Sequence, residues 1–201
     1  MISNPAKQGA RLRTTQERDE SGEQRRVFLR RCGTFGAGLG IAMTCAGSAV
    51  AASAGERRIA FTNIHTGERF DDVYRVGDHY LPGAIAKINH VLRDHRNDKV
   101  FPMAPGVIDL IYMIRRKAGV NHDFDIISGY RSPETNRMLR RASTGVAKNS
   151  LHMSGQAIDL KLPGLDLYDL RKIAIDLHVG GVGYYPDSGF VHVDIGEVRT
   201  W

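Results

Sequence analysis

One stretch of the sequence reads Ser150-Leu151-His152-Met153-Ser154-Gly155-Gln156-Ala157-Ile158-Asp159. Gly155 favours a turn, and the residues that follow it predict a strand over 157–162. Because side chains alternate along a strand, Ile158 and Leu160 face one way and Asp159 faces the other. A carboxylate that points away from an aliphatic face, close to a loop histidine, needs a polar partner or a cation.

A second stretch, near the end of the chain, reads Phe190-Val191-His192-Val193-Asp194. It predicts a strand that carries His192 and Asp194 on one face and apolar residues on the other. Two strands and a loop histidine could therefore bring His152, Asp159 and His192 around one ion. Two imidazoles and a carboxylate, with a fourth position open, are typical ligands of catalytic zinc. From spacing alone, buried ion pairs explain the same residues equally well, so both interpretations stay open.

The rest of the pattern predicts four helices and four further strands. The helices are expected at 82–93, 105–119, 133–141 and 166–177, from apolar spacing, proline or a capping residue at the start, and glycine near the end. The other strands are expected at 58–63, 69–76, 124–127 and 181–185, with 142–151 as a polar loop. This order predicts the α+β class, with helices packed on a small, mostly antiparallel sheet.

The first 54 residues have the features of an export signal. A twin-arginine pair, Arg25-Arg26, precedes an uncharged run over 32–54 that ends in small residues. This order predicts a Tat-type signal peptide over 1–54 and a mature domain over 55–201. The alternative is a retained anchor, but the many glycines make the run weakly hydrophobic. We therefore expect no stable membrane span after signal cleavage.

Charge and cysteine content exclude some classes of partner and site. The net charge is +6, but residues 1–54 hold eight basic and four acidic residues, so the remainder is nearly neutral. No basic stripe with interleaved aromatic residues occurs there, so no nucleic-acid partner is expected. Both cysteines, Cys32 and Cys45, lie in the signal. A metal site in the mature domain must therefore use histidine and carboxylate ligands.

Several motifs together resemble a known family. They are Ser128-Gly129-Tyr130-Arg131-Ser132, Asn136, the His152 to Asp159 stretch, the late Phe190-Val191-His192 strand, Asn63 to Glu68, Arg93 to Arg96, Gly180 to Tyr185 and Trp201. This set resembles the D-alanyl-D-alanine peptidase branch of the LAS metallopeptidases. More closely, it resembles the Tat-exported, murein endopeptidase K-like proteins of Gram-negative bacteria. The resemblance implies a hedgehog/DD-peptidase-like fold.

The resemblance also implies a function and a set of site residues. It implies a periplasmic zinc peptidase that acts on the stem peptides and cross-links of peptidoglycan, with Zn²⁺ as its cofactor, and we expect a monomer. By position, His152 and Asp159 would be the first two metal ligands and His192 the third. Arg131 would hold a substrate carboxylate or the developing oxyanion.

One departure from the relatives leaves the roles of two residues open. Several relatives carry an acidic residue three positions before the last ligand, where this chain has Gly189. Either His192 binds the metal and Asp194 acts as base or orienting group, or Asp194 binds the metal and His192 is catalytic. Asp187 is a third candidate for the base. We expect His192 as the ligand, with Asp194 and Arg131 as the catalytic residues.

Three functions are compatible with this resemblance. The expected function is a murein endopeptidase that cuts peptide cross-links. The first alternative is a D-alanyl-D-alanine or L,D-carboxypeptidase that trims stem peptides, because the choice of bond depends on the shape of the cleft. The second is a catalytically silent peptidoglycan-binding module of the same fold.

Overall fold

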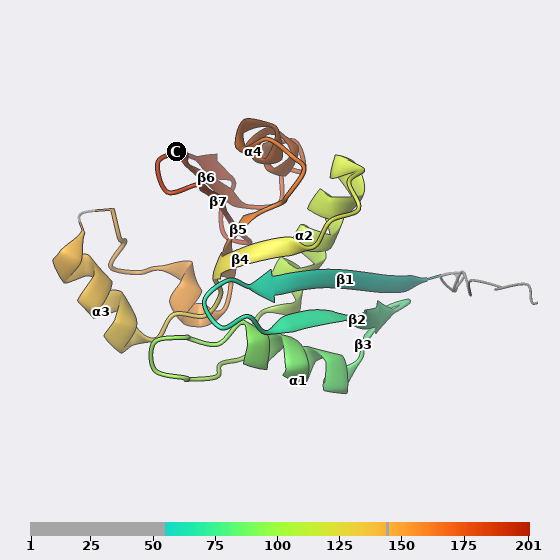
Figure 1. The fold of residues 1–201 in the computed structure, drawn as a ribbon, viewed down its shortest axis with the longest axis horizontal. Coiled ribbons are helices and arrows are strands. Elements are labelled where there is room, and N and C mark those ends of the chain that lie inside the picture. The colour runs from blue at the N-terminus through green and yellow to red at the C-terminus, as the bar shows by residue number, and fades with distance from the viewer. Residues whose placement is uncertain (1–54, 144) are drawn as a thin grey trace, which may run out of the picture. The chain divides into compact units, whose positions relative to one another are not determined.

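The computed structural model describes residues 55–143 and 145–201, so the predicted signal peptide over 1–54 lies outside the described residues. Within them, eight strands form one sheet in the order β3-β2-β1-β4-β5-β7-β6-β8 (Figure 1). The strands are β1 (Glu56–Asn63), β2 (Arg69–Val76), β3 (His79–Tyr80), β4 (Phe124–Ser128), β5 (Ala157–Lys161), β6 (Gly181–Tyr185), β7 (Phe190–Asp194) and β8 (Arg199–Thr200). The helices are α1 (Pro82–Val91), α2 (Pro105–Ala118), α3 (Pro133–Ala142), α4 (Leu167–Ile175) and the 3₁₀ turn η1 (Leu151–Ser154).

The α+β prediction is confirmed. Most neighbouring strands run antiparallel, as expected, but β1 pairs with β4 in parallel, and β6 pairs with β8 in parallel. The β1–β4 pair joins the N-terminal hairpin to the strands that carry the candidate ligands. The two ends of the domain therefore share a single sheet.

The helix ends follow local chemistry. The first three α-helices each have proline in the first turn, where its fixed φ suits the helix and its missing N–H costs nothing. The Ser132 hydroxyl accepts a hydrogen bond from the Thr135 N–H at 3.2 Å at the start of α3. Asp166 caps α4 in the same way. Gly119, in the left-handed conformation, ends α2.

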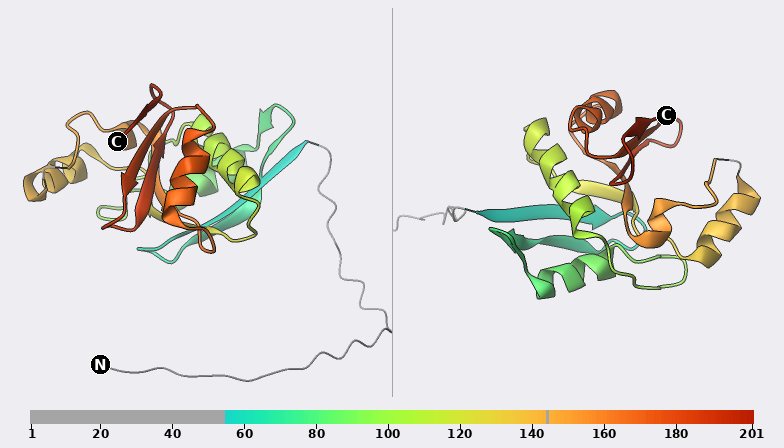
Figure 2. Two further views of the ribbon diagram at one scale, coloured as in Figure 1. Left: turned by 90° about the horizontal axis from the view of Figure 1, so that it is seen from above. Right: turned by 180° about the vertical axis from the view of Figure 1, so that it is seen from behind.

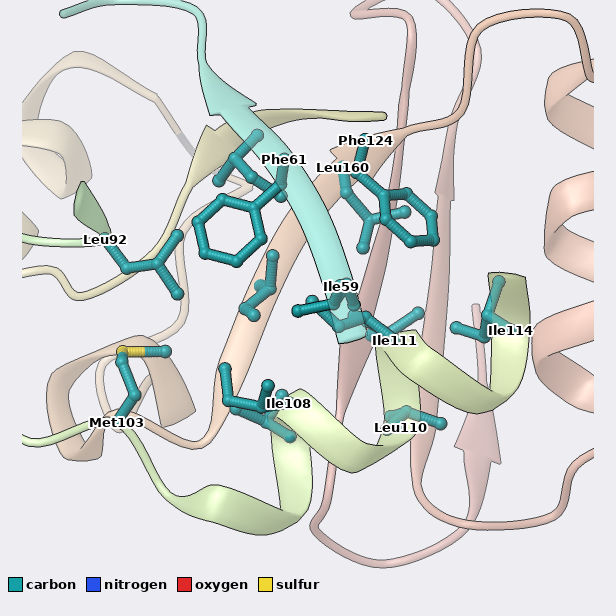
Figure 3. Packing of buried hydrophobic residues seen from close by; sticks show 14 of the residues in the cluster. Ile59, Phe61, Leu92, Met103, Ile108, Leu110, Ile111, Ile114, Phe124 and Leu160 are labelled. Carbon is teal, nitrogen blue, oxygen red and sulfur yellow. The ribbon is translucent and has the colours of Figure 1, made fainter. Parts of the chain in front are cut away.

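The main core lies between the sheet and the helices α1, α2 and α4. Figure 3 shows Ile108, Ile111 and Ile114 of α2 packed against Ile59 and neighbouring strand residues. These four isoleucine side chains are fully buried. Each such burial stabilises the fold by about 1.5–3 kcal/mol. In Figure 2, α4 lies beside β6 and β7, so the C-terminal strands share this helical layer.

The helix α3 lies apart from that layer (Figure 1). The chain after it is irregular, as predicted for 142–151, but it then forms η1, which the sequence pattern did not predict. The two-residue strands β3 and β8 were not predicted either. Among the described residues, no helix is both long enough and apolar enough to span a membrane.

Candidate metal centre

A row of four residues crosses the middle of the sheet. Ser128 of β4 lies opposite Asp159 of β5, Asp159 lies opposite His192 of β7, and His192 lies opposite Gly183 of β6. The alternating neighbours of these residues on β5 and β7 belong to the hydrophobic core: Ile158, Leu160, Val191 and Val193. The row therefore faces the side of the sheet away from the core.

The third candidate ligand, His152, is placed by the turn η1. Gly155 follows this turn with φ +66°, and a Cβ atom there would collide with the carbonyl oxygen of Pro102. The N–H of Ala104 donates to the Gly155 carbonyl at 2.9 Å, which ties the turn to the start of α2. The Nδ1 atom of His152 lies 2.7 Å from the Gly129 carbonyl oxygen. Its Nε2 atom is therefore the one directed at the sheet.

Three ligand atoms converge in front of the row. His152 Nε2 lies 3.2 Å from Asp159 Oδ1 and 3.2 Å from His192 Nδ1. His192 Nδ1 lies 2.8 Å from Asp159 Oδ1. Zinc bonds of about 2.0–2.1 Å in a tetrahedron place ligand atoms roughly 3.3 Å apart. The three side chains, all buried, lie close to this spacing and could hold a metal ion.

The second ring nitrogen of His192 meets Asp194. The Nε2 atom lies 3.0 Å from Asp194 Oδ2, and Asp194 is fully buried. Its carboxylate also accepts hydrogen bonds from the N–H groups of Gly181 at 2.9 Å and Gly196 at 2.8 Å, and from Arg199 Nη2 at 2.7 Å. All of its hydrogen-bonding capacity is thus used inside the protein.

The buried groups Asp159, His192 and Asp194 stabilise one another's charged forms. Burial alone would raise the pKa of Asp194, but the hydrogen bonds from His192, Arg199 and the backbone hold it below its usual value. Burial alone would lower the pKa of His192, but Asp159 and Asp194 together raise it to about 9. Burial likewise opposes ionisation of Asp159, and the two histidines nevertheless lower its pKa. The site favours a charged carboxylate on each side of His192.

Arg131 lies beside the ligands. Its backbone N–H donates to the His152 carbonyl at 3.1 Å, and its Nη2 atom lies 3.4 Å from both Asp159 Oδ2 and Ser128 Oγ. Its Nε atom has no hydrogen-bond partner among the described residues. Burial lowers the pKa of Arg131. The guanidinium is thus weakly paired within the protein and has donors in reserve.

These groups line a cleft of about 370 Å³. The lining includes residues of 143–151 and the aromatic residues Tyr185, Phe190 and Trp201. It also includes Arg131, Arg199 and the candidate ligands His152, Asp159 and His192. Asp194 and Asp187 are absent from the described lining. A cleft with two arginine side chains, three ligand atoms and several aromatic residues suits hydrolysis of a peptide.

The structure brings all five predicted site residues together, and it adds two that the sequence analysis did not place in the site. Arg199 forms an ion pair with Asp194, and the ring centroid of Trp201 lies 5.3 Å from that of His192. Arg199 begins the two-residue strand β8 and Trp201 directly follows it, and so short a strand has no periodicity to detect. The only available signal was the isolated tryptophan Trp201 at the end of the sequence.

Comparison with known proteins agrees with this geometry. Residues 51–201 match the family model described as peptidoglycan L,D-endopeptidase MepK. The chain is 43% identical over 145 residues to the peptidoglycan L,D-endopeptidase MepK of Escherichia coli strain K12, covering 72% of this chain and 80% of that protein. It is also 43% identical over 146 residues to a probable peptidoglycan L,D-endopeptidase MepK of Haemophilus influenzae, covering 72% and 78%. No solved structure matches the chain. The resemblance drawn from the motifs is therefore confirmed, and the chain belongs to the peptidoglycan L,D-endopeptidase MepK family.

Proposed function

We propose that this protein is a zinc-dependent endopeptidase that hydrolyses peptide cross-links of peptidoglycan. The observation that carries the proposal is the convergence of His152 Nε2, Asp159 Oδ1 and His192 Nδ1 beside an open cleft, in a chain of the MepK family. The two relatives described above are named as peptidoglycan L,D-endopeptidases. The shared family favours cutting of cross-links over trimming of stem peptides.

The donor set supports zinc as the metal. Two imidazole nitrogens and one carboxylate oxygen, at spacings of 2.8–3.2 Å, suit a tetrahedral ion with one position left for substrate or water. The sequence has no cysteine after Cys45, so no thiolate in the domain competes with these three residues for the metal. A bound zinc ion supplies a Lewis acid that polarises the scissile carbonyl and activates water.

We assign Asp194 the role of orienting His192. Its carboxylate is fully buried, is absent from the cleft lining and is saturated by donors. A carboxylate in this position fixes which nitrogen of a ligating histidine carries the proton, here Nε2, and leaves Nδ1 free to bind. This arrangement favours His192 over Asp194 as the third ligand.

We assign Arg131 to the substrate. Its guanidinium borders the ligands and keeps unused donors, so it can bind a substrate carboxylate or the oxyanion that develops during hydrolysis. Its ion pair with Asp159 at 3.4 Å is long, so turning toward substrate breaks no strong interaction.

The substrate places the protein in the cell envelope. We propose that residues 1–54 are a twin-arginine signal and that the remainder acts in the periplasm as a monomer. The twin-arginine pair Arg25-Arg26 supports the export route.

The test is digestion of purified, cross-linked sacculi, with and without a chelator, followed by chromatography of the muropeptides. Loss of dimeric muropeptides, blocked by chelator and restored by zinc, is expected. Intact dimers with shortened stem peptides would instead show a carboxypeptidase. No change in either class of muropeptide, from protein that still binds zinc, would show a silent binding module.

A further inference from the structure

We propose that Trp201 contacts the substrate and, with Tyr185 and Phe190, forms an apolar wall that receives the aliphatic part of the cross-link next to the scissile bond. The inference rests on the proposed function and names which part of the substrate this wall binds. Below, these three residues are called the aromatic wall. All three line the cleft that holds the candidate ligands.

The position of Trp201 is fixed by its backbone and by its ring. Its N–H donates to the Val182 carbonyl at 3.2 Å, and its carbonyl accepts from the Tyr184 N–H at 3.0 Å. Its indole Nε1–H donates to the Tyr185 hydroxyl at 2.7 Å. Arg199 packs against the indole, with its guanidinium carbon 5.0 Å from the ring centroid. The ring therefore has one defined place rather than a range of rotamers.

The sheet makes room for this ring at one position. A Cβ atom on Gly183 would lie 2.6 Å from the Trp201 indole. Gly183 is also the cross-strand neighbour of His192 on β6. Because Gly183 has no side chain, the indole of Trp201 occupies the space beside His192 that a side chain at position 183 would fill. The ring is thereby brought beside the candidate metal ligands.

Trp201 lines the cleft and is 46% exposed, which is high for an aromatic residue that is held by so many contacts. The only polar atom of its indole is already bonded to Tyr185, so the rest of the ring is apolar. The stacked pair Tyr185–Phe190, with centroids 4.7 Å apart, extends this apolar surface. A rigid, exposed aromatic surface beside reactive groups is typical of a binding site.

The groups that line the cleft differ in chemistry, and this difference assigns the substrate groups. Arg131 and Arg199 both offer charged donors, but Arg199 is already paired with Asp194. The indole of Trp201 offers no free hydrogen-bonding group, because its Nε1–H is bonded to Tyr185. A peptide cross-link carries carboxylates together with methylene and methyl groups. We therefore assign the carboxylate to Arg131 and the aliphatic chain to the aromatic wall.

The first arm of the test uses fluorescence. Trp201 is the single tryptophan of the full sequence, so intrinsic emission reports on the wall alone. Purified protein, both chelator-treated and zinc-loaded, is titrated with a soluble cross-linked muropeptide dimer. A saturable change in emission is expected, with no change on titration of the same concentration of free alanine.

The second arm measures kinetics on the same dimer. Trp201→Ala is expected to raise KM about tenfold while kcat and zinc affinity stay within about threefold of wild type. Trp201→Phe, which keeps a smaller apolar ring, is expected to raise KM about threefold. Tyr168→Ala removes another exposed aromatic ring, on α4 and away from the cleft lining, and serves as the matched control. Thermal unfolding shows whether each variant is folded. If Trp201→Ala is not folded, the KM of Trp201→Phe decides the test.

The outcomes separate this inference from the proposed function. Hydrolysis with an unchanged KM in Trp201→Ala and Trp201→Phe overturns the wall and leaves the endopeptidase intact. A fall in zinc affinity with unchanged KM also overturns it, because Trp201 would then support His192 only. Without hydrolysis by wild type, a saturable emission change keeps the wall and removes the enzyme. If wild type shows neither hydrolysis nor a saturable emission change, both the aromatic wall and the proposed function are overturned.

Discussion

The ring of His192 is held between two carboxylates: its Nε2 atom lies 3.0 Å from Oδ2 of Asp194, on the side away from the other candidate ligands. Asp194 is held in turn by Arg199, with Nη2 at 2.7 Å from Oδ2. This chain of contacts fixes the tilt of the imidazole before any metal arrives. The His192 side chain therefore loses its rotational freedom when the protein folds, and not when a metal binds.

Removing either supporting residue should weaken metal binding. Asp194→Asn and Arg199→Met are each expected to lower zinc affinity about 10–100-fold, because the ring of His192 loses its anchor. Competition with a chromophoric chelator measures the affinity directly. Arg137→Met, on the exposed side of α3, is the control. Wild-type affinity in both site variants would contradict the orienting role of Asp194.

The candidate ligands themselves should be indispensable. His152→Ala and Asp159→Ala are each expected to abolish zinc binding and hydrolysis, since two ligands rarely retain the ion. The fold should largely persist, because these side chains face away from the hydrophobic core. Metal analysis after dialysis, circular dichroism and sacculus digestion make the three measurements. The exposed His79 of β3 provides a control variant, His79→Ala. Full activity in either ligand variant would remove the metal assignment.

The guanidinium of Arg131 should not be replaceable by an ammonium. Arg131→Lys is expected to lower kcat/KM about 100-fold, because a point charge cannot reproduce the planar pair of donors. Steady-state kinetics on a soluble muropeptide dimer give this value. Zinc affinity should stay within a few-fold of wild type. Turnover equal to wild type would assign Arg131 a structural role only.

The turn that presents His152 should be sensitive to one methyl group. Gly155→Ala forces a side chain into the left-handed region and against the Pro102 carbonyl. We expect a loss of about 2–4 kcal/mol in the free energy of unfolding, measured with urea. Gly189→Ala is the matched control, because Gly189 has φ +71° but nothing within 4 Å of the added atom. That control should cost only about 1 kcal/mol. Equal losses in the two variants would show that the collision is relieved cheaply.

The buried Asp94 should make stability depend on pH. Its carboxylate accepts hydrogen bonds from the N–H groups of Ser132 at 2.9 Å and Arg96 at 3.1 Å. Burial opposes ionisation, but these and neighbouring hydrogen bonds lower the pKa of Asp94. Its contribution is therefore complete above the unfolded pKa of about 3.9 and is lost as the pH falls through the lower folded value.

The corresponding variant isolates this contribution. Asp94→Asn is expected to lose about 1–3 kcal/mol at pH 7, and its difference from wild type should shrink below about pH 4. Urea unfolding at pH 7, 5 and 3 gives the comparison. Asp78→Asn changes a carboxylate that is 97% exposed and should leave stability within about 0.5 kcal/mol. A difference that grows as the pH falls would contradict the assigned sign.

Local chemistry explains the elements that the sequence predicted well. Pro105 and Gly119 define the limits of α2, and alternation along 157–161 and 190–194 separates the core face from the face with ligands. These signals depend on neighbours in the chain, so they can be recognised without the fold. For His152, Asp159 and His192, strand alternation left a metal site and buried ion pairs equally open, and the family resemblance was needed to expect them as ligands.

The features that were missed depend on contacts between distant segments. The parallel pairing of β1 with β4 arises between residues about 60 positions apart, and no local pattern encodes it. The roles of Arg199 and Trp201 depend on the place that β8 takes beside β6. The choice between Asp194 as ligand and as orienting group depended on burial and on four hydrogen-bond donors, which a sequence does not display.

The direct pairing of Asp159 with His192 ties metal chemistry to strand alignment. If β5 shifted against β7 by one residue, Ile158 and Leu160 would leave the hydrophobic core, and Asp159 would no longer lie opposite His192. A misaligned chain would lose the proposed metal site, so binding of the metal would report whether these two strands are correctly aligned. The same link predicts that damage to the interior of these two strands will first appear as loss of metal, before the domain unfolds.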